Sequence, residues 1–261
     1  MNCRKYFILI ILSFVVSSAF SQSERENYID SKGKRQGAWK GYDPMGALKF
    51  VGQFKDDKPY GKFTYYYTNG KTKAVTQFAP NGKDATTELF HKNGVIMARG
   101  KYLNQQREGE WRFYSDYDSA LISTEHYIDG KREGKIITYY PESGNIAEEI
   151  NYKDDWEEGP FKRFFDSGQV KAEGQYVRGR QVGVVKHYYA DGKVSIQGQY
   201  QKGLKSGIWS FYDEKGELWK KDKYKNGRLI DSKIYKEPKE EEMKKIDEKD
   251  VFKDIPKSND K

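Results

Sequence analysis

The sequence has one cysteine, three histidines and one long apolar run, and these scarcities exclude several kinds of protein. Cys3 is the only cysteine in 261 residues, so the chain can form no internal disulfide. The apolar run, Phe7–Val16, is too short to span a membrane comfortably, and no other segment is more apolar. His91, His126 and His187 stand at different places in the pattern described below, so we expect no shared metal site.

Residue patterns typical of catalysis are also missing. We find no Ser-His-Asp or Cys-His arrangement, no nucleophile elbow and no phosphate-binding glycine loop. We therefore expect no enzyme activity, no cofactor and no metal. The net charge is +8, from 47 basic and 39 acidic residues, and both signs are interspersed. Nucleic-acid binding needs a denser basic patch, so we expect no nucleic acid partner.

The first 21 residues have the pattern of a secretory signal peptide. Arg4 and Lys5 precede the apolar run, and Ala19-Phe20-Ser21 is a small-x-small cleavage sequence. The alternative is an uncleaved anchor helix, but polar residues follow at once and favour cleavage before Gln22. Cys3 precedes the apolar run, so we expect no lipidation. The protein is expected to be exported to the periplasm, the outer surface or the extracellular space.

Eight copies of a 24- or 25-residue unit fill most of the remaining chain. With the first residue of each copy numbered as position 0, positions 5 and 17 are aromatic in every copy. Position 2 is usually large and apolar, with Thr87 as the exception, and position 11 is mostly aliphatic. Copies 4 and 5 need one inserted residue to fit. This regularity predicts a quasi-one-dimensional array. The copies begin at Gly37, Gly61, Ala85, Gly109, Gly134, Gly159, Gly183 and Gly207.

Each copy is expected to form a β-hairpin, because aromatic and β-branched residues between glycines favour strands. Dipeptides such as Asn69-Gly70 and Asp191-Gly192 predict a tight two-residue turn at positions 8 and 9, with positive φ at both. A looser turn is expected near the end of each copy. This register places position 2 opposite 15, position 6 opposite 11, and position 17 opposite the starting glycine. A ring at position 2 would then cover a glycine on the partner strand.

Alternation along the strands predicts positions 2, 11 and 17 on one face and position 5 on the other. The expected fold is all-β: an extended, open array of about eight antiparallel hairpins in one twisted sheet, without a helical domain. The predicted division is a signal peptide (1–21), an N-terminal capping segment (22–36), the repeats (37–235) and a charged tail (236–261). The tail has few apolar residues, so we expect it to be disordered.

The Gly-x-Trp-x-x-Tyr-Tyr-x-x-Gly pattern resembles the bacterial variant of the MORN repeat. Residues 62–71 and 207–216 are good specimens, and the resemblance covers about residues 27 to 235. Proteins of this kind are often named toxin-antitoxin system YwqK family antitoxin. The resemblance implies an array of β-hairpins with a role in protein or membrane association. It implies no catalytic residues.

The aromatic columns are the feature with binding potential. Spaced rings flanked by lysine can stack on sugars, hold quaternary ammonium groups or anchor peptides, although they can also be the packing of the sheet itself. Trp156 follows two acidic residues in a turn unlike that of the other copies. We predict an exported, non-enzymatic scaffold of the cell envelope that binds a partner protein. The alternatives are an aromatic-lysine face that binds phospholipid head groups or glycans, and an antitoxin or immunity protein. The candidate binding residues are Tyr66, Tyr114, Tyr139, Trp156, Phe164, Tyr188 and Tyr212.

Overall fold

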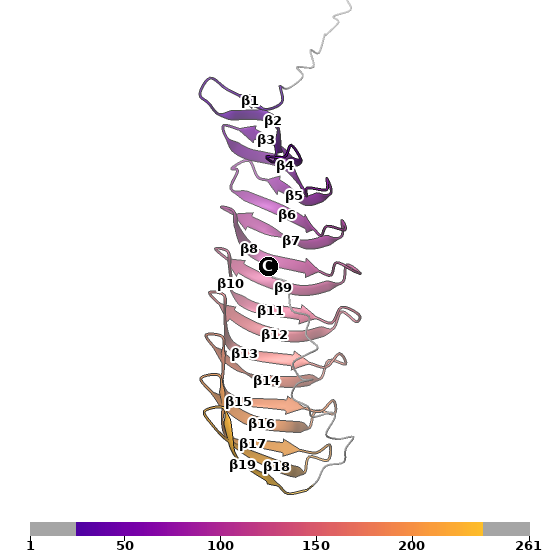
Figure 1. The fold of residues 1–261 in the computed structure, drawn as a ribbon, viewed down its shortest axis with the longest axis vertical. Helices are drawn as coiled ribbons and strands as arrows, with labels where there is room; N and C mark the ends of the chain where they lie inside the picture. Colours follow the sequence, from indigo (N-terminus) through magenta and orange to yellow (C-terminus); the bar gives the residue numbers. More distant parts are fainter. Residues whose placement is uncertain (1–24, 237–261) are drawn as a thin grey trace, which may run out of the picture.

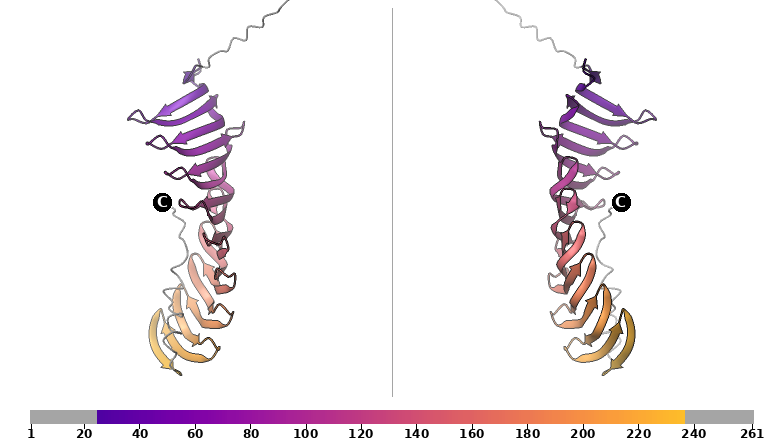
Figure 2. Two further views of the ribbon diagram at one scale, coloured as in Figure 1. Left: turned by 90° about the vertical axis from the view of Figure 1, so that its right-hand side faces the viewer. Right: turned by 90° about the vertical axis from the view of Figure 1, so that its left-hand side faces the viewer.

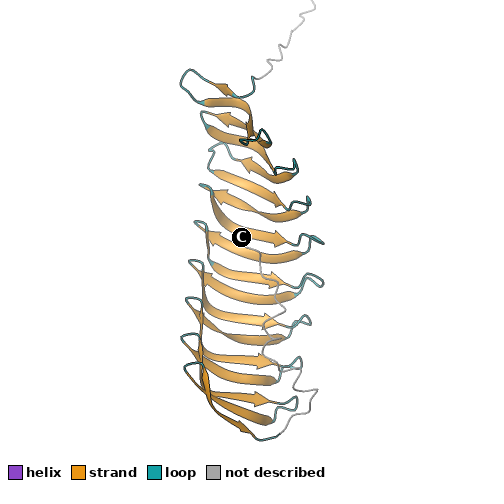
Figure 3. Ribbon diagram, in the orientation of Figure 1, coloured by secondary structure: helices purple, strands orange, loops and turns teal. Residues whose placement is uncertain are grey.

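The structure is a computed structural model that describes residues 25–236, so the expected signal peptide and nearly all of the charged tail lie outside the described residues. All regular structure in the described part is β-strand (Figure 3). Nineteen strands form one antiparallel sheet, in which strands pair with their neighbours along the chain (Figure 1). The expected all-β array of antiparallel hairpins is therefore confirmed. Residues 25–236 contain no helix long and apolar enough to cross a membrane.

The eight copies supply β2 to β18, and in copy 5 the first strand is broken into β10 and β11. The short β1 pairs with β2 at one end, and β19 pairs with β18 at the other. The strands are β1 (Tyr28–Ile29), β2 (Arg35–Tyr42), β3 (Leu48–Lys55), β4 (Lys58–Tyr66), β5 (Thr72–Phe78), β6 (Asp84–Phe90), β7 (Ile96–Leu103), β8 (Gln106–Tyr114), β9 (Leu121–Ile128), β10 (Lys131–Arg132), β11 (Gly134–Tyr139), β12 (Ile146–Lys153), β13 (Trp156–Phe164), β14 (Val170–Val177), β15 (Arg180–Tyr188), β16 (Val194–Gln201), β17 (Leu204–Tyr212), β18 (Leu218–Lys225) and β19 (Arg228–Ile234).

The array is long and one sheet thick. Figure 2 shows that the hairpins bend and that the strand direction turns steadily from one end to the other. Twist of this kind is the ordinary behaviour of a large open sheet. Because all described strands belong to this one sheet, a side chain in the described part is buried mainly by its neighbours along the array.

The first turn of each copy is looser than the sequence predicts. In copy 2 the Tyr67 amide donates to the Lys71 carbonyl and the Gly70 amide to the Tyr67 carbonyl, which leaves three residues in the loop. Only the glycine has positive φ, +79° at Gly70, so the expected two-residue turn is wrong. A three-residue loop with glycine in the left-handed region is a common hairpin connection. The inserted residue of copies 4 and 5 lies in this turn, where the Tyr140 amide donates to the Asn145 carbonyl.

The second turn is the tight one in every copy except copy 2, where the Ala79 amide donates to the Asp84 carbonyl across a longer loop. Asp56 and Asp57 have φ values of 51° and 67°, and Asp154 and Asp155 have 50° and 68°. Positive φ at both central residues matches the twist of the flanking strands, and aspartate, asparagine and glycine adopt it most readily. The expected assignment of tight and loose turns is therefore reversed.

Two local departures cancel along the first hairpin of each copy. The three-residue loop pairs position 5 with position 11, as in Tyr66 opposite Thr72. A β-bulge at position 12 then restores the predicted register, so that Phe63 at position 2 faces Thr76 at position 15. Position 2 opposes position 15 as predicted, but position 6 does not oppose position 11. Since paired residues project from the same face, position 11 lies with position 5, and its expected place beside positions 2 and 17 is wrong.

In copies 2, 4 and 8 the large ring at position 2 lies over a glycine of the preceding copy. A Cβ on Gly52 would stand 2.3 Å from Phe63, and one on Gly198 would stand 2.2 Å from Trp209. The sequence predicts a glycine of the ring's own hairpin, and this holds for Phe161 over Gly174 in copy 6. The glycines beneath Phe63 and Trp209, however, belong to the copy before the ring. The starting glycines make this possible, because all seven have φ between 66° and 95° and allow a bulge where the two copies meet.

The junction of copies 2 and 3 departs from this arrangement at three linked positions. Ala85 replaces the starting glycine, and β5 pairs with β6 without a bulge. Thr87 replaces the ring at position 2, and Thr76 replaces the glycine that would lie beneath it. The two threonine hydroxyls hydrogen-bond at 2.9 Å, and both side chains are buried. The exceptions seen in the sequence at Ala85 and Thr87 are thus parts of one change.

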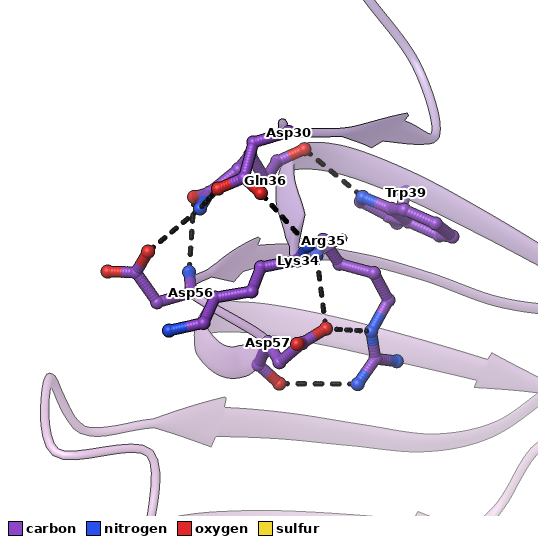
Figure 4. A network of polar contacts seen from close by, with 7 residues as sticks. All are labelled: Asp30, Lys34, Arg35, Gln36, Trp39, Asp56 and Asp57. Carbon is purple, nitrogen blue, oxygen red and sulfur yellow. Dashed lines mark hydrogen bonds and ion pairs between the residues drawn. The ribbon is translucent and has the colours of Figure 1, made fainter. Parts of the chain in front are cut away.

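A network of polar contacts holds the N-terminal end of the array (Figure 4). The backbone amide and the Nε of Arg35 both donate to Asp57 Oδ1, at 3.0 Å each. The Gln36 side-chain amide donates to Asp30 and Asp56, at 2.9 Å to each carboxylate. The segment before the first copy is therefore fixed by side chains as well as by strand pairing.

Candidate functional site

One face of the sheet carries a column of aromatic rings that follows the long axis. Rings at positions 17 and 2 alternate and meet edge to face, with 5.3 Å between the centroids of Phe54 and Phe63 and 5.1 Å between Phe63 and Phe78. Tyr102 and Trp111 repeat the contact at 5.0 Å. Positions 4, 13 and 15 lie on the same side, and we call this side the groove face. Edge-to-face contacts are favourable, so the column stabilises the array where these rings meet.

The column is interrupted at copy 3, and a groove of about 780 Å³ opens there. Thr87 stands where a ring would lie between Phe78 and Tyr102, and the small side chains of Ala74 and Ala85 also line the opening. The groove extends over copies 1 to 3 and its lining is mainly apolar. Its volume is in the range of known binding sites. The charged residues that line it are Arg35, Asp57 and Lys83.

Basic side chains of the chain itself lie over the rings at position 17. The guanidinium of Arg35 is 3.9 Å from the centroid of Phe54, and that of Arg132 is 4.5 Å from the centroid of Tyr152. Each cation comes from the second residue before the start of its copy, and the contact recurs in copies 4 and 8. Cation–π contacts of this kind are favourable. The position-17 rings of copies 1, 4, 5 and 8 are therefore already in contact with a cation of the chain.

Four ionisable side chains are buried on the groove face in the middle of the array, one in each of copies 4 to 7. They are Glu125, Glu148, Arg163 and His187, at positions that are apolar or small in most other copies. Glu148 accepts a hydrogen bond from Arg163 Nε at 2.6 Å, and Glu125 accepts one from Tyr127 at 2.5 Å. Buried charges are costly unless they are paired in this way. The groove face thus changes from apolar in the first copies to polar in the middle.

Burial shifts the pKa of His187 and of Glu157. Burial, together with the positive charges of Arg163 and Lys205, lowers the pKa of His187 to about 4. Burial and the carboxylate of Glu148 raise the pKa of Glu157 above its ordinary value. His187 is therefore neutral in the folded protein at physiological pH.

The candidate rings at position 5 lie on the face opposite the groove. Each pairs across its hairpin with position 11, as Tyr188 does with Val194. Tyr188 donates to Glu173 at 2.6 Å, and burial and this bond raise the pKa of Tyr188 to about 12. Each hairpin contributes one of these rings, and none of them lines the groove. Their binding role stays a prediction. All six are partly buried: Tyr66, Tyr114, Tyr139, Phe164, Tyr188 and Tyr212.

Trp156 lies apart from the other candidates, at the start of β13 beside a second turn. It is 59% exposed, and its ring covers Gly179 of the next second turn, where a Cβ would stand 3.3 Å away. The acidic turn before it has a regular conformation, and Asp154 pairs with Lys131 of the preceding copy at 2.9 Å. The residue types of this turn are unusual, but its geometry is that of the other copies.

Two features of the groove face have no counterpart in the sequence-based expectations: the groove itself and the buried charged line. A signal for the charged line exists, because Arg163 occupies a position that is phenylalanine at Phe113 and Phe211. A charged residue at a position that is aromatic in other copies indicates that its surroundings on the groove face are polar. The groove could be inferred from Thr76, Ala85 and Thr87 only if the ring at position 2 were known to lie over the preceding copy.

Comparison with known families bears on the repeats directly. The family model described as MORN repeat variant matches five segments, at residues 59–79, 132–154, 157–178, 181–202 and 205–226. Five of the eight copies are therefore similar to the MORN repeat variant. The five segments correspond to copies 2, 5, 6, 7 and 8, and each begins two residues before the starting glycine. Copy 3, with its alanine and threonine exceptions, lies outside the matched segments.

No curated protein sequence matches this chain. Solved structures that match include one described as TcdB2-TccC3-Cdc42, at 11% identity and a TM-score of 0.18 over 75% of this chain and 14% of that chain. A TcdB2-TccC3-TEV structure is 10% identical, with a TM-score of 0.19 over 76% of this chain and 12% of that chain. The Tc holotoxin pore of Photorhabdus luminescens is 12% identical, with a TM-score of 0.17 over 75% and 13%. This chain spans about a seventh of the length of these chains or less.

Proposed function

We propose that this protein is a non-enzymatic repeat scaffold of the cell envelope that binds a partner protein in the groove of copies 1 to 3. The groove carries the proposal, because it is an open, mainly apolar surface lined by aromatic rings. Interruption of the ring column at Thr87 leaves Phe78 and Tyr102 partly exposed. Apolar pockets of this kind suit the aromatic or aliphatic anchor residues that dominate protein interfaces.

The repeat architecture supports the same proposal. Arrays of stacked repeats present extended surfaces, and such surfaces are commonly used to bind other proteins. The MORN-variant repeats agree with a scaffold or binding role. Binding of quaternary ammonium head groups is less well supported at the position-17 rings, because Arg35 and Arg132 already contact Phe54 and Tyr152 there. An antitoxin role has no structural feature in its favour, and co-expression with a neighbouring toxin tests it.

Site-specific photo-crosslinking in the native cell tests the groove. A crosslinking amino acid at Leu89 would lie in the groove, whereas one at Thr86 would lie on the opposite face of the same strand. We expect a discrete protein adduct from Leu89 and none from Thr86. Adducts of the same kind from both positions, or from neither, would count against binding in the groove.

Export is proposed from residues 1–21, which have the features of a signal peptide. Mass spectrometry of the protein from fractionated cells is expected to find a mature chain that starts at Gln22, in the envelope or the medium. An intact N-terminus in the cytoplasmic fraction would contradict both cleavage and export.

A further inference from the structure

The two ends of the array differ, and the last strand has an open edge. β19 lies at the end of the sheet and pairs with β18 alone among the described strands (Figure 1). It is the only described strand of more than two residues in which every side chain is exposed. Its apolar side chains Leu229, Ile230 and Ile234 are 52%, 53% and 59% exposed. An exposed edge of this kind can pair with a strand of another chain.

The first full strand, β2, has its outer edge covered by the chain itself. β1 pairs with it at Arg35 and Gln36. Farther along, the backbone amide of Asn27 donates to the Ala38 carbonyl at 2.9 Å. The side chain of Asn27 accepts from the Lys40 amide at 2.8 Å and donates to the Lys40 carbonyl at 3.1 Å. Within the described residues, the open edge of the array is therefore that of β19.

The backbone groups of β19 that face outward belong to alternate residues. The Tyr235 amide donates to the Trp219 carbonyl at 2.7 Å, so the backbone groups of Tyr235 point to β18. Those of Lys233 point the same way, because antiparallel strands exchange hydrogen bonds at every second residue. The amide and carbonyl groups of Ser232 and Ile234 therefore point away from β18, where a further strand would bind them.

We infer that β19 pairs in antiparallel fashion with β19 of a second copy of this chain, with the two Ser232 residues opposite each other. In this register Asp231 of each copy lies opposite Lys233 of the other, which gives two pairs of opposite charge about a two-fold axis. Ile230 and Ile234 of the two copies come next to each other outside these pairs. Opposite charges and apolar side chains in facing positions stabilise a strand pair.

The charges also select this register over its neighbours. A shift of two residues is the smallest that keeps the outward backbone groups paired, and it places Asp231 opposite Asp231 or Lys233 opposite Lys233. Like charges directly opposite each other are destabilising. Within residues 25–236 neither side chain has an ion-pair partner, so both are available to a second copy. Charges on an edge strand commonly prevent pairing, but here they complement each other in one register.

The resulting contact is closed, because both copies use the same strand and each strand is then paired on both sides. One sheet would continue across the two copies, with both groove faces on the same side and the grooves of copies 1 to 3 at its outer ends. A pair of seven-residue strands is a small interface, so we expect a dimer that dissociates on dilution. The inference rests on β19 and not on the function proposed for the groove.

Sedimentation of residues 22–261 over a range of protein concentrations tests the inference. The parent protein is expected to convert from monomer to dimer as the concentration rises. Asp231→Lys and Lys233→Asp each create two pairs of like charge, so each should raise the dissociation constant at least about tenfold. The double variant, which exchanges the two charges, should restore dimerisation. Circular dichroism confirms that the variants are folded.

Disulfide formation tests the register, because residues 22–261 contain no cysteine. Ser232→Cys would place two thiols opposite each other at the two-fold axis. Ile234→Cys is the matched control, since it lies on the same exposed strand but opposite Ile230 of the second copy. We expect mild oxidation to link Ser232→Cys into a covalent dimer about tenfold faster than Ile234→Cys.

Four outcomes would overturn the inference. A monomer at all concentrations would show that the edge of β19 does not pair. Species that grow beyond a dimer would indicate a head-to-tail contact. A double variant no more dimeric than the single variants would place the contact elsewhere. Equal or faster linkage of Ile234→Cys would exclude the register centred on Ser232.

Discussion

Trp209 is 1% exposed in a sheet one layer thick, and the residues that cover it explain how this protein forms a core. Gly198 leaves room beneath the ring. The rings of Tyr200 and Tyr224 flank it, with centroids at 5.2 and 6.1 Å. Lys205 lies against its face at 4.3 Å. Each partner comes from the same or an adjacent strand, so a local set of residues buries a large side chain without a second layer.

The glycine beneath this ring is expected to be essential for stability. Gly198→Ala should lower the free energy of unfolding by about 1–3 kcal/mol, because its methyl group would displace Trp209. Gly174→Ala is the matched control and should cost less, since the nearest ring atom, in Phe161, is 2.7 Å away and lies at the ring edge. Urea denaturation followed by tryptophan fluorescence measures both. Near-zero losses at both positions would show that the rings do not depend on these glycines.

His187 is expected to make stability fall in acid. Its pKa is lowered to about 4 in the folded protein from an ordinary value of 6.5, chiefly by burial. Between these values the unfolded chain binds a proton that the folded chain does not, so the free energy of unfolding decreases as the pH falls through this window. The loss from pH 7.5 to pH 5 should be about 2 kcal/mol.

The matched variant for this effect is His187→Phe, which introduces the residue found at the same position in copies 4 and 8. Urea unfolding of both proteins at pH 7.5 and pH 5 measures the difference. The variant should lose less stability on acidification than the parent, because the other titrating groups are common to both. The same pH dependence in both proteins would rule out His187 as its source.

At the scale of the hairpin, the strands could be predicted from the sequence but the turns could not. Regular aromatic positions between glycines are sufficient to predict strands. The dipeptide Asn69-Gly70 suits both a two-residue turn and a three-residue loop, and only the hydrogen bond from the Gly70 amide to the Tyr67 carbonyl distinguishes them. The predicted pairing of positions 2 and 15 was nevertheless correct, because the extra loop residue and the bulge offset each other.

The candidate site was harder to predict, for a related reason. The ring of Phe63 lies over Gly52, which belongs to the preceding copy, and this contact depends on a bulge between copies. Pairing rules within one hairpin cannot indicate a contact between two hairpins. The groove at Thr87 depends on that contact, so its position follows from the three-dimensional arrangement and not from the repeat pattern alone.

The three linked residues at the junction of copies 2 and 3 are expected to respond to substitutions as a unit. Thr76→Gly, Ala85→Gly and Thr87→Phe should each destabilise the protein when made alone, because each leaves the other two mismatched. The triple variant should be more stable than the sum of the single changes predicts, by about 0.5–3 kcal/mol, as is typical of residues in contact. Unfolding by urea of the four variants measures the coupling. Strict additivity would show that the three residues are independent.

At the scale of the whole molecule, each hairpin of the described residues pairs only with the hairpins next to it, so distant copies are connected through the copies between them. The strands of this array form one sheet in which contacts run from hairpin to hairpin. Stability in such an array is approximately a sum of terms for each repeat and each junction, so one end can open while the other stays folded. A partner in the groove of copies 1 to 3 would therefore stabilise those copies most.

Hydrogen exchange of two mirrored variants tests this locality. Gly52→Ala would bring a methyl group against Phe63 near one end, and Gly198→Ala would do the same against Trp209 near the other. The first variant should accelerate amide exchange in β2 to β5 and leave β15 to β18 unchanged, and the second should give the reverse pattern. About tenfold faster exchange is expected for each 1.4 kcal/mol lost locally. Uniform acceleration along the sheet in either variant would mean that the array unfolds as one cooperative unit, and the copies could not then respond separately to a partner.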